Sequence, residues 1–279
     1  MKINWFPGHM TKALRELKKE VKNVDAIIYV LDARAPLASL NPELDKLAEN
    51  KPVLFVLNKI DLADADKINK LISDEVIKKK YKNSSIIKLN ATASGAIKII
   101  ASEIKELCKN KIERFENKGL NSFIRAMVVG VPNSGKSTLV NNICGRVKAL
   151  TGNKAGVTRG KQWLTVSNGF QILDTPGTLY PNLENQNVAR KLAYIGSIRD
   201  EVLDKNELAC DFISDIRKIY PNTLSKRYNI DESGEPYEVL EKIAFSRKFL
   251  LKGGDVDYDR ASIALIDDFR KGKLGNITL

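Results

Sequence analysis

The run Gly-Val-Pro-Asn-Ser-Gly-Lys-Ser at 130–137 constrains the fold of this chain more than any other feature. It fits the pattern GxxxxGK[ST], with an apolar run at 123–129 that predicts a buried strand before it and a predicted helix at 136–143 after it. In that setting the loop's N–H groups surround phosphate, Lys136 neutralises it and Ser137 ligates Mg²⁺. An ordinary glycine turn does not require this order of strand, loop and helix. The run therefore predicts an α/β protein that binds a nucleoside phosphate.

A second phosphate motif is predicted at Asp-Thr-Pro-Gly, 174–177. It follows two short apolar runs, 163–167 and 170–173, which predict a hairpin with Asn168-Gly169 at its turn. Asp174 is expected to hold the metal ion through its outer coordination sphere, and the N–H of Gly177 is expected to contact the γ-phosphate.

The sequence Asn-Lys-Ile-Asp at 58–61 indicates which base the site accepts. It ends a predicted strand at 52–57, and ligands bind at the carboxyl ends of parallel strands. The Asp61 carboxylate can accept two hydrogen bonds from guanine, whereas adenine offers no such pair of donors. Lys59 is expected to lie along the base, and Asn58 to brace the neighbouring loops. Four residues alone fit an ordinary strand-end turn equally well, but beside the two phosphate motifs they predict a guanine site.

The order of the motifs is the reverse of the usual one in GTPases, because the base-reading motifs precede the phosphate loop. Asn90-Ala91-Thr92, after a predicted strand at 85–89, is expected to close over the base with backbone N–H groups, although this motif is weak by itself. The order predicts a circular permutation, with the usual fold cut after 174–177 and its old termini joined near 116–122. The predicted fold class is α/β: a circularly permuted P-loop GTPase domain with a six-stranded, mostly parallel sheet, followed by a smaller all-helical domain.

Two domains are predicted, a GTPase domain at 1–185 and a helical domain at 186–279, because the strand pattern stops near residue 185. The predicted strands are 24–31, 52–57, 85–89, 123–129, 163–167 and 170–173. One predicted helix begins at Pro42, and the others span 67–80, 96–115, 136–143, 187–198, 207–219, 237–251 and 258–270.

With these motifs in view, the chain resembles the circularly permuted GTPases and, within them, the ribosome biogenesis GTPase A family of the YlqF type. The resemblance covers essentially the whole chain. It implies a role in late assembly of the large ribosomal subunit, in which the protein binds the subunit precursor and its ribosomal RNA and leaves after GTP hydrolysis. The motifs that carry it are Trp5-Phe6-Pro7-Gly8-His9-Met10, Asp32-Ala33-Arg34-Ala35-Pro36, 58–61, 130–138, Gly156-Val157-Thr158 and 174–177.

The motifs and the resemblance together assign roles to individual residues. His9, Lys136 and Thr158 are expected to act in catalysis, and Ser137, Thr158 and Asp174 are expected to hold Mg²⁺. The predicted GTP- and GDP-binding residues are Asn58, Lys59, Ile60, Asp61, Asn90, Ala91, Asn133, Ser134, Gly135, Lys136, Ser137, Thr138 and Gly177.

One departure from Ras-like proteins concerns the water that attacks GTP, because Thr178 stands where they carry a glutamine and the family usually carries a hydrophobic residue. The neutral imidazole of His9, the chain's single histidine, could orient that water, or His9 could pack in a turn or contact RNA. Asn133 also fits two interpretations: a ligand for K⁺ near the phosphates, or a residue chosen for turn geometry.

The net charge of +12 lies entirely in the first 185 residues, which carry 30 basic and 18 acidic side chains against 16 of each in the rest. This surplus suits RNA phosphates, although solvated lysine-rich helices explain it equally well. The apolar runs are far shorter than the ~20 residues of a membrane span. No charged-then-apolar leader opens the sequence, and the three cysteines form no CxxC pair. A cytoplasmic monomer that does not associate with membranes is expected.

Three functions remain open at this point. The favoured one is a GTPase switch that RNA stimulates. The second is an assembly scaffold in which GTP only fixes a conformation, which the missing glutamine favours. The third is a membrane-recruited signalling switch, which the absence of a lipidation motif disfavours.

Overall fold

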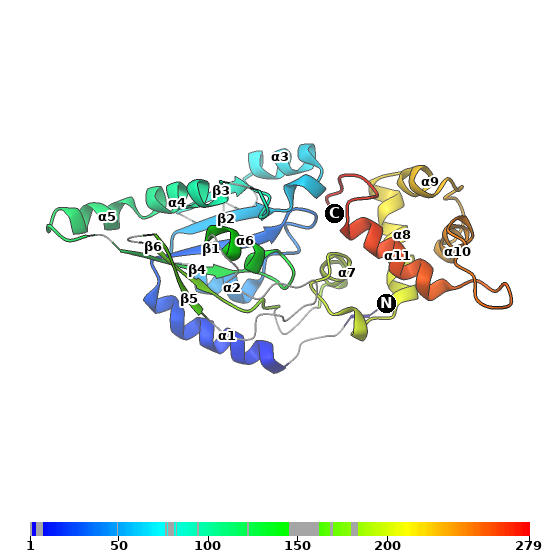
Figure 1. The fold of residues 1–279 in the computed structure, drawn as a ribbon, viewed down its shortest axis with the longest axis horizontal. Helices are drawn as coiled ribbons and strands as arrows, with labels where there is room; N and C mark the ends of the chain where they lie inside the picture. Colours follow the sequence, from blue (N-terminus) through cyan, green and yellow to red (C-terminus); the bar gives the residue numbers. More distant parts are fainter. Residues whose placement is uncertain are drawn as a thin grey trace.

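A single six-stranded sheet forms the centre of the first part of the chain (Figure 1). The computed structural model describes residues 2–3, 8–48, 50–75, 77, 81, 83–93, 95–121, 123–144, 162–167, 170–179 and 184–279, without the side chains of His9, Gln162 and Ser167. The strands are β1 (Ala26–Asp32), β2 (Val53–Asn58), β3 (Ser84–Lys88), β4 (Ile124–Val129), β5 (Gln162–Ser167) and β6 (Phe170–Asp174).

The strand order β3-β2-β1-β4-β6-β5 confirms the predicted mostly parallel sheet. Only β5 runs antiparallel, against its hairpin partner β6, and every other pairing is parallel. The strand before the phosphate loop, β4, lies between β1 and β6. Strands from both ends of this part of the sequence therefore flank β4, as the predicted permutation requires.

Helices cover both faces of the sheet, because the strands are apolar on both sides. One face packs against α1 (Gly8–Glu20), α2 (Pro42–Ala48) and α3 (Ala65–Ser73). The other face packs against α4 (Ala96–Leu107) and α6 (Lys136–Ile143). Pro42 takes the first position of α2, and the Asn41 side chain caps it by accepting from the N–H of Glu43 (3.0 Å), as the sequence predicted.

Only helices and short loops make up the chain described after residue 184. They are α7 (Gln186–Tyr194), α8 (Lys205–Ile219), α9 (Thr223–Tyr228), α10 (Pro236–Ser246) and α11 (Tyr258–Arg270). Their apolar core also includes Ile3, Met10, Val131 and Leu179 from the first part of the chain. The backbone N–H of Ile3 donates to the Gln186 side chain (2.7 Å). The helices are therefore packed onto the sheet part through a shared core rather than held by a linker alone.

Several helices differ from the sequence predictions. Helix α1 was not predicted, and α7 and α10 end at Tyr194 and Ser246 rather than at residues 198 and 251. The helix predicted at 96–115 is two helices, α4 and α5 (Lys109–Glu116), because Cys108, with ψ of 10°, leaves the helical conformation between them. Helix α3 ends at Ser73 rather than residue 80, and the positive φ of Glu75 (51°) turns the chain away. Helix α9 was not predicted, because its six residues are too few to show a helical period.

Candidate functional site

Two glycines give the loop at 130–137 its close fit against the sheet. Gly130 has φ of 150°, and a Cβ there would collide with the carbonyl oxygen of Val30 on β1. Gly135, which precedes α6, has φ of 93°, and a Cβ there would collide with the Asn58 side chain. The loop therefore lies directly on the ends of β1 and β2, at the carboxyl edge of the parallel strands.

Lys136, at the start of α6, and Asp174, at the end of β6, are both buried at this edge of the sheet. The ammonium group of Lys136 donates to the carbonyl of Val131 (2.8 Å). Burial lowers the pKa of Lys136 to about 8, although the Asp174 carboxylate opposes that shift. Burial likewise raises the pKa of Asp174. Burial thus disfavours both charged forms, and the charge of each group partly offsets that effect on the other.

The donor set at this point fits a Mg²⁺ nucleotide. Asp174 Oδ1 and the hydroxyl of Ser134 are buried and accept or donate no hydrogen bond among the described residues. A buried carboxylate oxygen is a ligand that Mg²⁺ or one of its waters prefers. The sequence analysis assigned Asp174 and Ser137 to the metal ion. Asp174 is the last residue of β6, and Ser137 lies in the first turn of α6, at the same carboxyl edge of the sheet.

Gly177 brings the segment after β6 against the phosphate loop. A Cβ on Gly177 would lie 2.7 Å from the Cα of Pro132 and 3.0 Å from the Lys136 nitrogen, so only glycine permits this approach. The next residue, Thr178, is fully buried, and its backbone N–H donates to the carbonyl of Gly130 (3.2 Å). A buried threonine with its backbone tied to the loop stands where Ras-like proteins place their glutamine.

Asn58 joins three loops of the site, as the sequence analysis expected. Its amide nitrogen donates to the carbonyl of Ser134 in the phosphate loop (2.8 Å), and its oxygen accepts from the N–H of Ala91 (2.8 Å). Asn142 of α6 holds the same loop by donating to the carbonyl of Ala91 (2.8 Å). The Asn90 side chain accepts from Thr92, which fixes the local turn.

Lys59 crosses from the Asn-Lys-Ile-Asp motif to the phosphate loop. Its ammonium group donates to the carbonyl of Asn133 (2.6 Å) and pairs with the buried carboxylate of Asp32 (2.8 Å). Arg34 binds the same carboxylate through two nitrogens (2.9 and 2.7 Å). Burial acts to raise the pKa of Asp32, but Arg34 and Lys59 outweigh it and hold that pKa well below its ordinary value. Asp61 itself is exposed, on a short 3-10 turn at Ile60–Leu62.

Several positioning residues were not predicted from the sequence. Asp32 and Arg34 were noted only as part of the family resemblance, although a charged pair ending an apolar strand is itself an unusual pattern. Asn133 donates to the carbonyl of Gly196 (2.6 Å), and Ser197 donates to the carbonyl of Pro132 (2.7 Å). Nothing in the sequence around 196–197 indicates this contact, because it arises from tertiary packing after α7.

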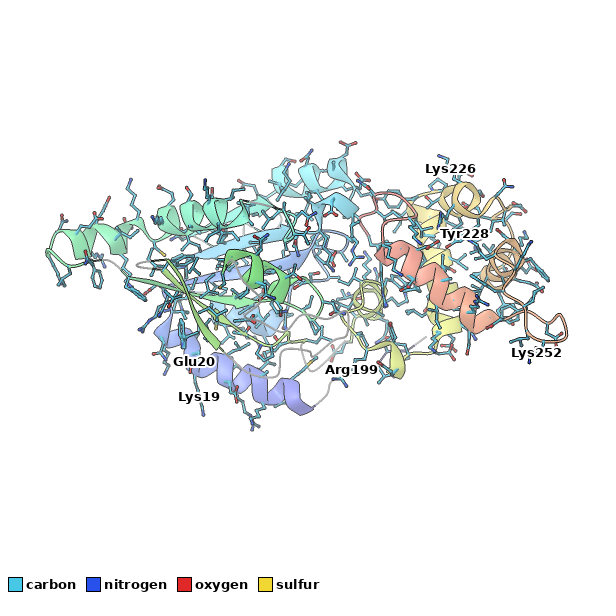
Figure 2. The ribbon with its side chains drawn as sticks, viewed as in Figure 1. Lys19, Glu20, Arg199, Lys226, Tyr228 and Lys252 are labelled. Atoms are coloured by element: carbon cyan, nitrogen blue, oxygen red, sulfur yellow. The ribbon has the colours of Figure 1, made fainter. Side chains whose placement is uncertain are left out.

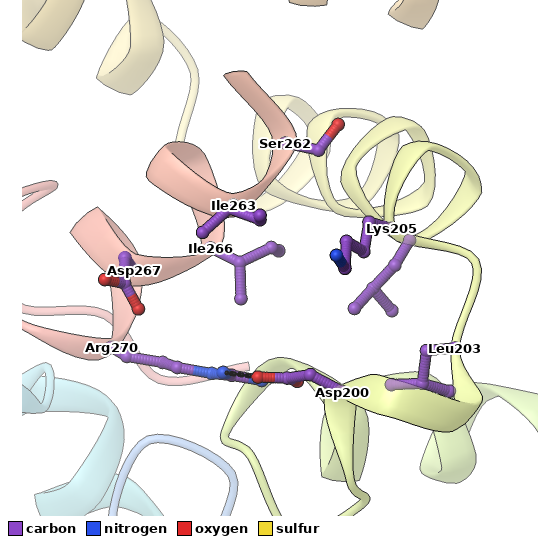
Figure 3. Close-up of a pocket in the computed structure, with 9 residues that line it drawn as sticks. Asp200, Leu203, Lys205, Ser262, Ile263, Ile266, Asp267 and Arg270 are labelled. Carbon is purple, nitrogen blue, oxygen red and sulfur yellow. Dashed lines mark hydrogen bonds and ion pairs between the residues drawn. The ribbon is translucent and has the colours of Figure 1, made fainter. Parts of the chain in front are cut away.

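Arg270, the last residue of α11, connects α11 to the end of α7, just before the Gly196–Ser197 segment that contacts the phosphate loop. Its guanidinium donates to the last carbonyls of α7, at Ala193 (2.8 Å) and Tyr194 (2.9 Å), and pairs with Asp200 (2.7 Å). A cavity of about 50 Å³ adjoins the Arg270–Asp200 pair, with Leu203, Lys205 and Ile266 in its wall (Figure 3). None of its lining residues belongs to the motifs at 58–61, 130–137 or 174–177, so this cavity is separate from the nucleotide site.

Two predicted functional residues cannot be placed. Thr158 lies outside the described residues, as does the rest of the Gly156-Val157-Thr158 motif. The backbone of His9 belongs to the first turn of α1, but its side chain is not among those described. Among the described residues no helix is long and apolar enough to cross a membrane.

Comparison with known proteins bears directly on this arrangement. Residues 125–233 match a family model described as "50S ribosome-binding GTPase". The chain is 40% identical to ribosome biogenesis GTPase A of Bacillus cereus over all of this chain and 93% of that protein. It is 30% identical to ribosome biogenesis GTPase A of Thermotoga maritima over 99% of this chain and 93% of that protein.

Solved structures give the same result. The GDP-bound structure of YlqF from Thermotoga maritima aligns with a TM-score of 0.67 at 27% identity, over 95% of this chain and 97% of that one. A structure of the same protein described as GNP-bound aligns with a TM-score of 0.66 at 28% identity, over 96% and 97%. The fold is thus shared over almost the full length of both chains.

Proposed function

The chain belongs to the ribosome biogenesis GTPase A family and is a GTPase, and from that premise we propose that it assists assembly of the large ribosomal subunit. It binds the subunit precursor through ribosomal RNA while it holds GTP, and it leaves after hydrolysis. The observation that carries this proposal is the junction at Asn58, which ties the base-reading loops to a phosphate loop of GTPase sequence. The names of the relatives support the ribosomal part.

The residue roles in this proposal are those that the motifs and the family resemblance assign. Lys136 neutralises the β- and γ-phosphates, Gly177 offers its N–H to the γ-phosphate, and Asp61 reads guanine. Mg²⁺, when bound, supplies charge neutralisation between the phosphates, and Ser137, Asp174 and Thr158 would hold it. The remaining contacts to GTP or GDP come from Asn58, Lys59, Ile60, Asn90, Ala91, Asn133, Ser134, Gly135 and Thr138.

The positive charge of the first 185 residues supports RNA as the partner. Sedimentation of the protein with large-subunit precursor particles over a salt series tests this. Each phosphate neutralised releases counterions, so the apparent affinity is expected to fall steeply as salt rises. If the affinity does not change with salt, the protein binds the particle through ribosomal proteins rather than through RNA.

Release after hydrolysis has its own test. Particles are incubated with the protein and either a non-hydrolysable GTP analogue or GDP. The proposal expects retention with the analogue and dissociation with GDP. Equal retention in both states would favour the scaffold alternative. A cytoplasmic, monomeric protein fits this cycle.

His9 orients the attacking water in this proposal, because Thr178 is buried and lacks the amide group of the glutamine that it replaces. His9→Ala is expected to leave nucleotide and particle binding nearly intact and to lower particle-stimulated turnover sharply. If binding and turnover fall together, His9 is a docking residue.

Asn133 binds K⁺ near the phosphates in the same proposal. Its amide nitrogen donates to the Gly196 carbonyl (2.6 Å), and an amide oxygen is the kind of ligand that K⁺ accepts. Hydrolysis is expected to be faster in K⁺ than in Na⁺ buffer at equal ionic strength. Equal rates would leave Asn133 with a role in turn geometry alone.

A further inference from the structure

Two half-exposed aromatic side chains and an arginine lie together at one corner of the sheet. Phe123 precedes β4 and is 38% exposed, and Trp163 on β5 is 37% exposed. The guanidinium of Arg125 on β4 lies 5.8 Å from the centroid of the Phe123 ring and 5.5 Å from that of Trp163. An arginine in contact with two aromatic rings forms a planar, cationic surface that stays open to solvent.

Polar side chains from the neighbouring strands complete this surface. The register places Arg125 of β4 opposite Gln171 of β6, and Gln171 opposite Thr165 of β5. The Gln171 amide donates to the Thr165 hydroxyl (3.3 Å), and both groups keep further hydrogen-bonding capacity. We call Phe123, Arg125, Trp163, Thr165 and Gln171 the aromatic surface.

Folding alone does not account for this exposure. The same sheet face is covered further along β4 and β6, where Met127 and Leu173 are buried against Leu14 and Leu17 of α1. The covering helix therefore buries Met127 and Leu173, whereas Arg125 near the start of β4 and Trp163 on the edge strand β5, opposite Leu173, stay exposed. Large aromatic side chains on an open sheet face are a recurrent feature of binding surfaces.

The charges around the aromatic surface favour a polyanion. Asp25 accepts from the backbone N–H of Arg125 (2.9 Å) and pairs with Lys111 (2.7 Å), so its negative charge is compensated. Lys19 of α1 is exposed on the outer side of that helix (Figure 2). Lys22, in the 3-10 turn Val21–Asn23 after α1, is also exposed and precedes Asp25, whose N–H donates to the carbonyl of Arg125. The acidic Glu20 lies among them, but the cations exceed it in number.

We propose that the aromatic surface stacks unpaired bases of single-stranded RNA, with Lys19 and Lys22 placed for the adjoining phosphates. Aromatic rings and arginine planes accept bases by stacking, and the amide and hydroxyl of Gln171 and Thr165 can bond base edges. Arg125 lies near the start of β4, whereas the phosphate loop follows its end. The Arg125 end of the surface therefore lies away from the phosphate loop. This inference rests on the proposed partner and specifies which form of RNA is bound.

The first test uses Trp163 as its own reporter. The chain has two tryptophans, so Trp5→Phe leaves Trp163 as the single tryptophan, and selective excitation of tryptophan reports on it alone. Single-stranded RNA of about ten nucleotides, close to the site sizes of stacking proteins, is expected to quench its emission. A duplex of the same sequence serves as the matched control and is expected to quench far less. Equal quenching by duplex, or none by the single strand, overturns the proposal.

The second test separates stacking from simple burial at the same position. Trp163→Phe keeps an aromatic plane, whereas Trp163→Leu keeps the apolar bulk without one. In sedimentation with precursor particles the leucine variant is expected to bind about 5- to 150-fold more weakly, the range for loss of one stacked base. The phenylalanine variant is expected to stay near wild type. GTP turnover without particles checks that both variants are folded.

The two tests distinguish failure of the proposed function from failure of the proposed role of the aromatic surface. If the wild-type protein does not bind particles at all, the proposed function fails, whereas the fluorescence test still decides on the aromatic surface. If the wild type binds and the leucine variant binds equally well, the aromatic surface is not used and the proposed function stands. Weaker binding of the leucine variant to particles without any quenching by free RNA would assign the surface to a ribosomal protein, against the proposal.

Discussion

At the scale of single residues, the proposal makes base choice depend on Asp61. Its carboxylate is exposed at the carboxyl edge of the sheet, while Lys59 beside it is fixed between Asp32 and the phosphate loop. Asp61→Asn exchanges one acceptor oxygen for an NH₂ donor and opposes the donors of guanine. We expect GTP affinity to fall by about 10- to 100-fold, as for loss of a charged hydrogen-bond partner, and xanthosine triphosphate to bind better.

Equilibrium titration of both nucleotides against wild type and variant measures this exchange. Asp66→Asn, on the exposed side of α3, is a control for a change of surface charge in the same region. Unchanged GTP affinity in the Asp61 variant would contradict the guanine assignment.

The buried carboxylate of Asp32 predicts a pH dependence of stability. Its pKa is held below that of an unfolded aspartate by Arg34 and Lys59, so its contribution is complete above about pH 4 and is lost as pH falls further. Asp32→Asn leaves the Arg34 charge buried and is expected to lower the free energy of unfolding by about 3–5 kcal/mol near neutral pH.

Urea unfolding of both proteins over a pH series checks this. The difference between them is expected to stay constant down to about pH 4 and to shrink below it. A difference that is small at neutral pH, or that grows as the solution becomes more acidic, would show that the Asp32 ion pairs do not stabilise the fold.

Residues that act through local sequence were predictable, whereas residues that act through tertiary contacts were not. The glycines of the phosphate loop and the bracing role of Asn58 follow from spacing alone, because loop and strand end are fixed by the motifs. The contacts of Asn133 with Gly196 and of Pro132 with Ser197 join segments more than sixty residues apart. The Arg34 pair depends on burial, which the motif does not reveal.

At the scale of elements, the segment after α11 closes onto the base-reading loop. The backbone N–H of Ile277 donates to the carbonyl of Leu62 (3.1 Å). The hydroxyl of Thr278 donates to the carbonyl of Ala33 (3.0 Å) and accepts from the N–H of Asp64 (3.1 Å). This segment therefore holds the loop that carries Asp61 from the side of the helices.

Thr278→Val removes that hydroxyl from a buried site and leaves the Asp64 N–H without its acceptor. We expect the free energy of unfolding to fall by about 1–3 kcal/mol and GTP affinity to weaken, since the loop is less well held. Thr278→Ser retains the hydroxyl and is the matched control. Thermal unfolding and nucleotide titration measure both effects. If the valine variant binds GTP with wild-type affinity, the segment after α11 does not support the nucleotide site.

The sheet was more predictable than the helices. Strands β1 to β6 differ from their predicted bounds by one or two residues, because short apolar runs between polar loops define buried strands well. Helix ends depend on single φ and ψ values, as at Cys108 and Glu75, which composition and period do not specify.

At the scale of the whole molecule, the permutation joins the phosphate site to the helices. The segment after Gly177 leads into α7, and Gly196 and Ser197 beyond α7 return to bond the phosphate loop. Arg270 then ties the end of α7 to α11. A change in the loop on hydrolysis can thus reach the helices through direct contacts. The domain boundary at 185/186 stays a prediction, since the helical core takes in residues from both sides.

Turnover of GTP with and without purified large-subunit precursors tests the central claim most directly. The account predicts slow hydrolysis by the protein alone and a marked rise in the rate when precursors are added. ATP is expected to remain unhydrolysed under both conditions, because adenine lacks the donors that Asp61 requires. Equal GTP turnover with and without precursors would contradict the claim that this GTPase acts on the assembling subunit.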